Sequence, residues 1–233
     1  MRACAPERPL GPEVEPRAAR RPARVTLEGR FVRLEPLAPA RHGAALWNNL
    51  AGADEVWDYL FDVPFADEAG FVADIARKAM SEDPLFWAIV DKASNQAQGY
   101  ATLMRVDPVH RTIEVGNILF APSLQRKPGA TEAMALLAAH AFEALGHRRY
   151  EWKCNALNAP SRAAAERLGF TFEGVFRQHM IVKGRNRDTA WYAMLDTEWP
   201  AVKRGFARWL APENFDEAGR QRRSLADLRS SDA

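Results

Sequence analysis

The stretch Leu124-Gln-Arg-Lys-Pro-Gly-Ala-Thr-Glu-Ala133 has the composition and surroundings of an anion-binding loop. An apolar, strand-like run at residues 112–120 precedes it, and an amphipathic helical pattern begins at Thr131. A strand that leads through a polar loop into a helix directs free backbone N–H groups and the positive end of the helix dipole toward one point. This arrangement predicts a phosphate-binding loop. The alternative is that Pro128-Gly129 only forms the turn that such a helix requires.

The cysteines and histidines do not indicate a second kind of chemistry. Cys4 and Cys154 are the two cysteines in 233 residues, too few for a disulfide framework. Cys154 falls in an expected strand, where a cysteine is more often a small buried residue than a nucleophile. The five histidines lack the spacing of metal ligands, so we expect no metal. This cysteine usage favours a reducing, cytoplasmic compartment.

The first 24 residues differ in composition from the rest of the chain. They contain five prolines, six arginines and three glutamates. Such a segment buries too little apolar surface to offset its ordering entropy, so residues 1–24 are predicted to be disordered. The segment carries a net charge of +3 and the whole chain +2, which leaves the remainder near −1. A nucleic-acid partner is therefore unlikely, with binding through the Arg-rich tail as the alternative.

The periodicity of apolar residues predicts the elements that position the loop. In chain order we expect a strand or hairpin, two helices, three strands, a helix, a strand, a helix, a hairpin and a last helix. Their bounds are residues 24–37, 39–51, 67–80, 85–90, 99–106, 112–121, 131–145, 150–154, 162–168, 170–182 with 188–195, and 199–210. This order indicates one mixed α/β domain at residues 25–210 and a polar, loosely structured tail at 211–233. No apolar run is long enough to cross a membrane.

Four short segments occur in an order and spacing typical of one protein family. They are Gln125-x-x-x-x-Ala-Thr-Glu-Ala133, Asn155-x-x-Asn158-x-x-Ser161, Leu168-Gly-Phe170 and the hairpin Arg177…Gly184…Asp188…Tyr192. Over residues 25–199 the chain resembles the GCN5-related N-acetyltransferase (GNAT) superfamily, in particular the bacterial branch that acetylates ribosomal-protein N-termini. The resemblance implies a GNAT-like fold, with a mostly antiparallel twisted sheet of about seven strands flanked by helices. It also implies acetyl-CoA as co-substrate.

The resemblance implies which residues hold acetyl-CoA. Residues 117–120 would offer backbone groups to the pantetheine arm, and residues 126–131 would bind the pyrophosphate. Pro128 replaces the middle glycine of the family signature and has no N–H to donate, although Gly129 would restore close backbone approach. Asn158 would reach the pantetheine amides, with helix capping as the alternative. The implied cofactor-binding residues are Asn117, Ile118, Leu119, Phe120, Gln125, Arg126, Lys127, Gly129, Ala130, Thr131, Asn155 and Asn158.

Acetyl transfer to an amine requires a base for the ammonium proton, donors for the oxyanion and a proton for the departing thiolate. Glu114 is the candidate base because its apolar neighbours Ile113 and Val115 would partly desolvate it; an exposed or salt-bridged carboxylate is the alternative. Many family members use a tyrosine as the acid, but that position is Ala165 here. In the ribosomal-protein branch a serine stands at the position of Ser161, which would protonate the thiolate unless water does so.

The acceptor is expected to be a primary amine, such as a peptide N-terminus, an aminoacyl group or another small-molecule amine. The aromatic loop at residues 57–65 and the hairpin at residues 177–187 would form the walls of its site. Trp57, Tyr59 and Arg177 are the candidate substrate-binding residues, with core packing as the alternative for the two rings. A non-catalytic CoA-binding sensor with the same fold is the competing function, because of Pro128 and Ala165. Dimers are common in this branch, so the resemblance makes a homodimer possible, although the sequence does not give the oligomeric state.

Overall fold

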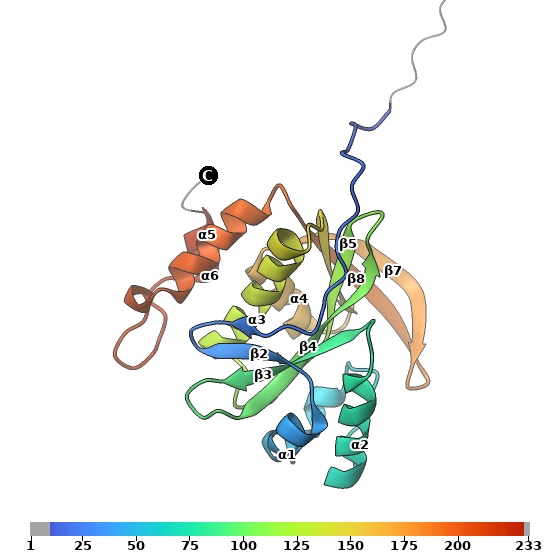
Figure 1. The fold of residues 1–233 in the computed structure, drawn as a ribbon, viewed down its shortest axis with the longest axis vertical. Helices are drawn as coiled ribbons and strands as arrows, with labels where there is room; N and C mark the ends of the chain where they lie inside the picture. Colours follow the sequence, from blue (N-terminus) through green and yellow to red (C-terminus); the bar gives the residue numbers. More distant parts are fainter. Residues whose placement is uncertain (1–9, 231–233) are drawn as a thin grey trace, which may run out of the picture.

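A single open sheet organises the computed structural model, which describes residues 10–230. Its eight strands follow the order β1-β2-β3-β4-β5-β6-β8-β7 (Figure 1). Neighbours are antiparallel except β5 and β6, which are parallel. The expected fold is confirmed, and the strand beyond the expected seven is the two-residue β1. The strands are β1 Leu27–Glu28, β2 Val32–Pro36, β3 Leu85–Asp91, β4 Ala97–Asp107, β5 Thr112–Phe120, β6 Arg149–Asn155, β7 Thr171–Val182 and β8 Arg185–Leu195.

Helices cover both faces of the sheet (Figure 1). They are α1 Pro39–Leu50, α2 Glu68–Ala79, α3 Pro128–Ala139, α4 Ala159–Leu168, α5 Trp199–Leu210 and α6 Leu225–Ser230. The sheet has a hydrophobic core on each face, and β3 contributes to both. Leu85, Trp87 and Ile89 pack on the side of α3 and α5, while Phe86 and Val90 pack on the side of α1 and α2. A strand buried on both faces reads as a continuous apolar run, as this one does.

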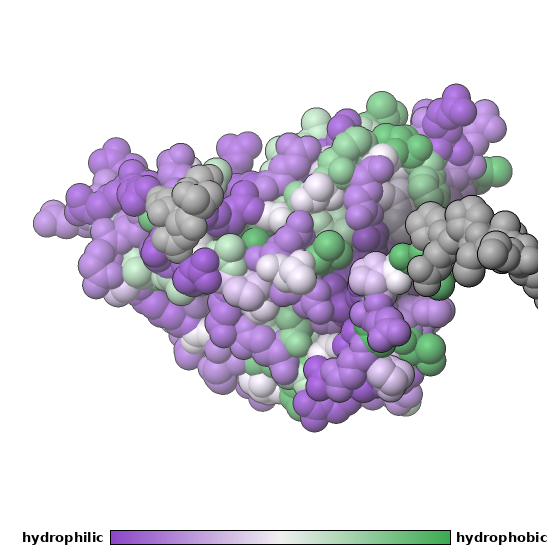
Figure 2. Space-filling model, turned by 90° about the horizontal axis from the view of Figure 1, so that it is seen from above, coloured by the Kyte–Doolittle hydropathy of each residue, from purple (hydrophilic) through white to green (hydrophobic). Residues whose placement is uncertain are grey.

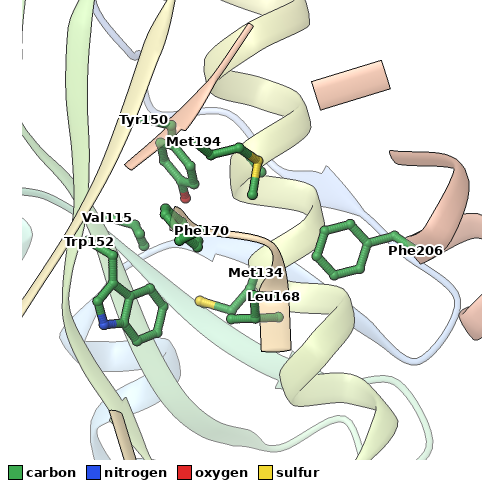
Figure 3. Close-up of a pocket in the computed structure, with 9 residues that line it drawn as sticks. Val115, Met134, Tyr150, Trp152, Leu168, Phe170, Met194 and Phe206 are labelled. Atoms are coloured by element: carbon green, nitrogen blue, oxygen red, sulfur yellow. The ribbon is translucent and has the colours of Figure 1, made fainter. Parts of the chain in front are cut away.

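The core between the sheet and α3 is tightly filled. A small cavity of about 10 Å³ lies in this region. Figure 3 shows the side chains of the sheet, α3, α4 and α5 that surround it. The Tyr150 hydroxyl is buried here and has no hydrogen-bond partner in the described chain. Burial raises the pKa of Tyr150 well above its usual value. The lining residues are Val115, Met134, Ala138, Tyr150, Trp152, Leu168, Phe170, Met194 and Phe206.

Glu132 fixes the N-terminal half of α3 against the β1–β2 hairpin. Its carboxylate accepts hydrogen bonds from the backbone N–H groups of Arg30 at 2.7 Å, Phe31 at 2.6 Å and Val32 at 2.9 Å. Glu132 is 5% exposed, so these charge-assisted bonds are largely shielded from water. Helix α3, which follows the predicted phosphate-binding loop, is thereby held to an element about 100 residues earlier in the chain.

The sheet opens between β5 and β6. Their parallel pairing runs from Thr112↔Arg149 to Val115↔Trp152 and then stops, although each strand continues. Beyond this point β5 pairs only with β4, and β6 pairs only with β8. Backbone groups of β5 after Val115 thus face an opening instead of a neighbouring strand. In the chain, β5 leads directly from this opening into the loop that starts α3.

Both terminal segments are more ordered than their composition indicates. Ala19 is buried and its N–H donates to Pro108 O at 2.9 Å, while Arg20 N–H donates to Leu145 O at 2.8 Å. Arg24 donates to the carbonyls of Ala79 and Ser81. The prediction of disorder through residue 24 is therefore wrong for residues 19–24, which are held by backbone hydrogen bonds that composition does not reveal. Residues 1–9 lie outside the described part of the chain.

The C-terminal segment is also packed against the domain. Leu225 and Leu228 are buried next to α5, and the Asn214 amide donates to Trp209 O at 3.0 Å. The prediction of a loose tail is wrong for residues 212–230, because two leucines on α6 complete the apolar face of α5. Residues 231–233 of that tail lie outside the described chain. Within residues 10–230, no helix has the length and apolar character needed to cross a membrane.

Hydropathy is unevenly distributed over the surface. Figure 2 shows mainly hydrophilic residues at the left, on the side of α5 and α6, and hydrophobic residues gathered at the upper right. The edge strand β7 is largely exposed and carries Phe172, Val175, Phe176 and Ile181.

Candidate active site

A cleft of about 1010 Å³ occupies the opening between β5 and β6. One end is formed by the loop before α3 and by residues 215 and 219–221 of the C-terminal segment. The middle is formed by β5, β6 and the start of α4, and the other end by residues 55–56 and 59–61 with Arg105 and Arg187. A cleft of this size with a few converging polar groups is typical of a ligand site.

The loop before α3 presents backbone donors to the cleft. Arg126 has a positive φ of 58°, which turns the chain sharply before Lys127, the residue preceding α3. The Arg126 N–H has no backbone acceptor within residues 10–230. Pro128, at the helix start, has no N–H to donate. Gln125, Arg126, Lys127, Ala130 and Thr131 all line this end. Free amides at the positive end of a helix dipole suit a phosphate group.

Gly129 serves packing and does not line the cleft. A Cβ atom at this position would lie 2.8 Å from Val32 Cγ1, so the missing side chain lets α3 approach β2 closely. The expectation that Gly129 brings backbone close to a phosphate is therefore replaced by a close helix–strand contact. The next two residues, Ala130 and Thr131, do line the cleft.

Arg167 of α4 adds a cation to the phosphate end of the cleft. Its Nη1 donates to the Thr131 hydroxyl at 3.0 Å, and its guanidinium lies 5.0 Å from the Trp209 ring centroid. Burial lowers the pKa of Arg167. Arg220 also lines this end but pairs with Asp216 at 2.9 Å. The C-terminal segment thus forms a wall of the site that sequence reasoning did not predict.

On β5, Asn117 adopts a positive φ of 46° beside a register shift against β4. Gly116, Asn117, Ile118 and Phe120 line the cleft. Leu119 does not, because its side chain is 1% exposed within the core formed with α1 and α2. Three of the four β5 residues assigned to the pantetheine arm therefore lie at the opening.

Ser161 lies in the first turn of α4, where its hydroxyl faces the middle of the cleft. The hydroxyl accepts a hydrogen bond from Trp152 Nε1 at 3.1 Å. Because one lone pair of the Ser161 oxygen accepts this bond, the hydroxyl hydrogen can be donated to Cys154 or to a ligand. Burial raises the pKa of the Cys154 thiol, which is the behaviour of a structural cysteine.

Asn158 caps α4, as its alternative interpretation proposed. Its Oδ1 accepts from Ser161 N–H at 3.0 Å, which orients the turn that carries the serine. Its amide nitrogen still borders the cleft, as does Asn155, whose Oδ1 accepts from Leu157 N–H at 3.0 Å.

Glu114 is 3% exposed and its environment differs from the one expected. Its Oε2 accepts from Arg105 Nη1 at 2.9 Å and from Lys153 Nζ at 2.8 Å. The expectation that apolar neighbours desolvate an unpaired carboxylate is wrong, because side chains from β4 and β6 supply two cations. No partner contacts Oε1 within the described chain, and Glu114 borders the cleft.

The far end of the cleft combines rings and positive charge. Tyr59 and Phe61 line it, and Tyr59 donates to Leu157 O at 3.4 Å. Trp57 does not, since it is buried against Phe71 in the core, as the alternative interpretation held. Arg177 lies on the exposed part of β7 and does not reach the cleft. Arg187, on the same hairpin, does.

Most predicted site residues therefore converge, and four do not. Those outside the cleft are Leu119, Gly129, Trp57 and Arg177. Sequence reasoning did not single out several others that line it, namely Phe61, Arg105, Lys153, Arg167, Arg187, Trp209 and Arg220. Phe61 and Arg187 fell within segments expected to wall the acceptor site. No signal indicated the rest, because strand register places Arg105 and Lys153, and the packing of α4, α5 and the C-terminal segment places Arg167, Trp209 and Arg220. Among the described residues, no group of three or more His, Cys, Asp or Glu side chains could hold a metal ion.

Comparison with known families agrees with this geometry. The acetyltransferase (GNAT) domain matches residues 32–171, which include β2 through α4 and every element around the cleft's centre. The chain belongs to the GNAT acetyltransferase family. A solved GCN5-related N-acetyltransferase from Brucella melitensis is 49% identical, with a TM-score of 0.90, and the match covers 92% of this chain and 98% of that one.

Two further GNAT relatives differ in how much they share with this chain. The Bacillus subtilis (strain 168) protein named "Putative ribosomal N-acetyltransferase YdaF" is 34% identical over 105 residues, which are 45% of this chain and 57% of that protein. The chain thus spans little more than half of this relative. The microcin C7 self immunity acetyltransferase MccE, solved with acetyl-CoA and AMP, is 22% identical with a TM-score of 0.63 over 72% of this chain and 93% of that one. The similarity to MccE, at this sequence identity, shows a shared fold alone.

Proposed function

We propose that this GNAT protein transfers the acetyl group of acetyl-CoA to a primary amine by direct attack in a ternary complex. The observation that carries the proposal is the continuity of the cleft. It runs from free amides at the start of α3, past the unpaired edge of β5, to the Ser161 hydroxyl and Glu114. An extended thioester laid along this path would carry its phosphates at one end and its acyl group near the other.

At the cofactor end, the pyrophosphate would bind backbone N–H groups of residues 126–131, where Pro128 has none to donate, together with the Lys127 and Arg167 side chains. Arg167 already donates to the Thr131 hydroxyl, so a phosphate beside Thr131 would meet a fixed guanidinium. The pantetheine arm would lie along residues 116–120 and reach the amide of Asn158. Acetyl-CoA would enter as a co-substrate, with no metal in the proposal. The neighbour MccE was solved with acetyl-CoA, which supports the same donor here.

At the reacting centre, three groups would act on the thioester and the amine. A backbone N–H of β5 near Ile118 would stabilise the oxyanion that forms when the amine attacks the carbonyl carbon. Oε1 of Glu114 would accept the amine proton, directly or through water. The Ser161 hydroxyl would then give its hydrogen to the departing thiolate. The ammonium loses two protons: one passes through Glu114 to water, and the other, lost as the amide forms, returns to Ser161 after the serine's own proton has become the S–H of CoA.

The nature of the acceptor is proposed from the relatives and from the cleft's far end. The name of YdaF mentions ribosomal N-acetylation, which supports a peptide N-terminus as one candidate. Aminoacyl groups and other small amines are the further candidates. The rings of Tyr59 and Phe61 would contact an apolar or planar part of such an acceptor.

Thiol release from acetyl-CoA with a panel of amines tests this proposal. We expect CoA to be released only when a suitable amine is present, together with one acetylated product. A protein that binds acetyl-CoA but releases no thiol with any amine would favour the alternative, a CoA-binding sensor with a silent centre. A protein with no affinity for CoA at millimolar levels would contradict both.

Three further proposals accompany this function. Self-association as a homodimer is tested by sedimentation equilibrium. The absence of a nucleic-acid partner rests on the near-neutral charge of the domain and is tested by salt-dependent binding to DNA and RNA. A cytoplasmic location rests on the cysteine usage and is tested by cell fractionation.

A further inference from the structure

Arg187 is a buried cation that forms no ion pair within residues 10–230, although the Glu114 carboxylate, already paired with Arg105 and Lys153, attracts it electrostatically. It is 8% exposed, its Nε has no hydrogen-bond partner, and no carboxylate of the described chain forms an ion pair with it. Its guanidinium lies 5.2 Å from the centroid of the Phe61 ring, which covers one face. Desolvation by burial lowers the pKa of Arg187. An uncompensated buried charge is costly, so it is found mainly where a ligand completes the pair.

The surroundings of Arg187 reinforce its positive charge. Arg105 and Lys153 lie at the same end of the cleft and share one carboxylate, Glu114. Lys153 also pairs with Glu151 at 2.7 Å and sits 3.9 Å from the Trp191 ring centroid. The one other acidic residue that borders the cleft, within residues 10–230, is the exposed Glu55, which forms no ion pair. The acceptor end is therefore positive, although a neutral amine alone would need no such charge.

We propose that the acceptor amine carries an oxyanion group, a carboxylate or a phosphate, that binds the Arg187 guanidinium beside Phe61. This inference rests on the proposed function and specifies its substrate class. Arginine suits the role because its planar fork can donate two parallel hydrogen bonds to a carboxylate or phosphate. The Phe61 ring restricts the guanidinium to one plane, so the oxyanion would be bound edge-on and the amine would be held at a fixed distance from it.

Matched pairs of acceptors test this inference. The pairs are phenylalanine with phenylalaninamide, Ala-Glu with Ala-Gln, and O-phosphoethanolamine with ethanolamine, so that the arms separate α-carboxylate, side-chain carboxylate and phosphate. We expect the anionic member of at least one pair to have a KM lower by roughly 10- to 100-fold. Arg187→Gln should remove that difference by raising the KM of the anionic member, with a smaller change in kcat, and Arg187→Lys should restore part of it.

The matched control is Arg185→Gln, an exposed arginine two residues earlier on β8, which should leave the difference intact. Equal KM values within every pair, or a difference that persists in Arg187→Gln, would overturn the inference. So would a variant that raises the KM of acetyl-CoA instead. Calorimetry of the same pairs with the CoA-saturated protein gives the comparison without turnover. If no amine is acetylated, the proposed function fails while binding still decides the inference.

Discussion

The Glu114 carboxylate lies 2.8 Å from the Lys153 ammonium, and both side chains are at least 95% buried. This pair joins β5 to β6 just before the two strands separate. It therefore lies at the point where the cleft begins, with one carboxylate oxygen engaged and the other free. The same contact links the two strands, and in the proposed mechanism the free oxygen is the proton acceptor beside the thioester.

Glu114→Gln is predicted to lower kcat by about 10²-fold or more, because a positioned base contributes that much to proton transfer. Acetyl-CoA affinity should change little, since the cofactor phosphates bind at the other end of the cleft. Steady-state kinetics and CoA titration measure the two effects. The matched control is Glu173→Gln, which removes a carboxylate paired with Arg149 outside the cleft. A Glu114→Gln variant with full kcat would rule out the carboxylate as base.

Ser161→Ala is predicted to lower kcat by about 10- to 100-fold while the Kd for CoA stays near that of the wild type. Trp152 Nε1 would lose its acceptor, so thermal unfolding should be measured alongside. Ser123→Ala offers a control, because that serine bonds Asn49 away from the cleft. Unchanged turnover in Ser161→Ala would assign the proton to water.

The strands could be predicted closely from sequence, but two helix starts could not. The continuous apolar run at residues 85–90 and the alternation at residues 150–154 predicted strands within one residue of those observed. The helices predicted from Thr131 and Arg162 begin three residues earlier, at Pro128 and Ala159. In both cases a proline occupies the first turn, where its fixed φ and missing N–H are tolerated. Treating these prolines only as turn residues placed each start too late.

The loop before α3 could be singled out from sequence because its residues are contiguous, whereas the groups that converge at the far end of the cleft could not. Arg105, Glu114, Lys153 and Arg187 stand on four different strands, β4, β5, β6 and β8. Their convergence depends on the register of three strand pairs, which a single sequence does not reveal. For the same reason, the Glu114 carboxylate, expected among apolar neighbours on β5, is instead paired with Arg105 of β4 and Lys153 of β6.

Glu132→Ala is predicted to lower the free energy of unfolding by about 2–4 kcal/mol, because three backbone N–H groups of the β1–β2 turn would lose their shared acceptor. Urea unfolding measures this change. Glu132→Gln keeps one carbonyl oxygen and should cost less. If both variants unfold at the wild-type urea concentration, water must satisfy the turn as well as the carboxylate does. Glu132 borders no part of the cleft, so loss of activity should follow loss of folded protein.

Folding should weaken as the pH falls through the range in which buried histidines would titrate. Burial lowers the pKa values of His42, His140 and His147 below the ordinary 6.5. Above pH 6.5 these rings are neutral in both states, so their contribution is constant. Below it the unfolded chain takes up protons that the folded chain resists, and stability is lost until the folded pKa is reached.

His140→Phe tests this pH dependence at one position. The His140 Nε2 atom is buried without a partner in the described chain, and its ring packs edge-on at 6.2 Å from Trp87, so phenylalanine keeps the ring contact and removes the titration. We expect the drop in unfolding free energy between pH 7.5 and 5.5, measured in urea, to be smaller in His140→Phe than in the wild type. The exposed His110→Gln variant should retain the full drop. An equal drop in His140→Phe would mean that other groups, such as paired carboxylates, account for the acid sensitivity.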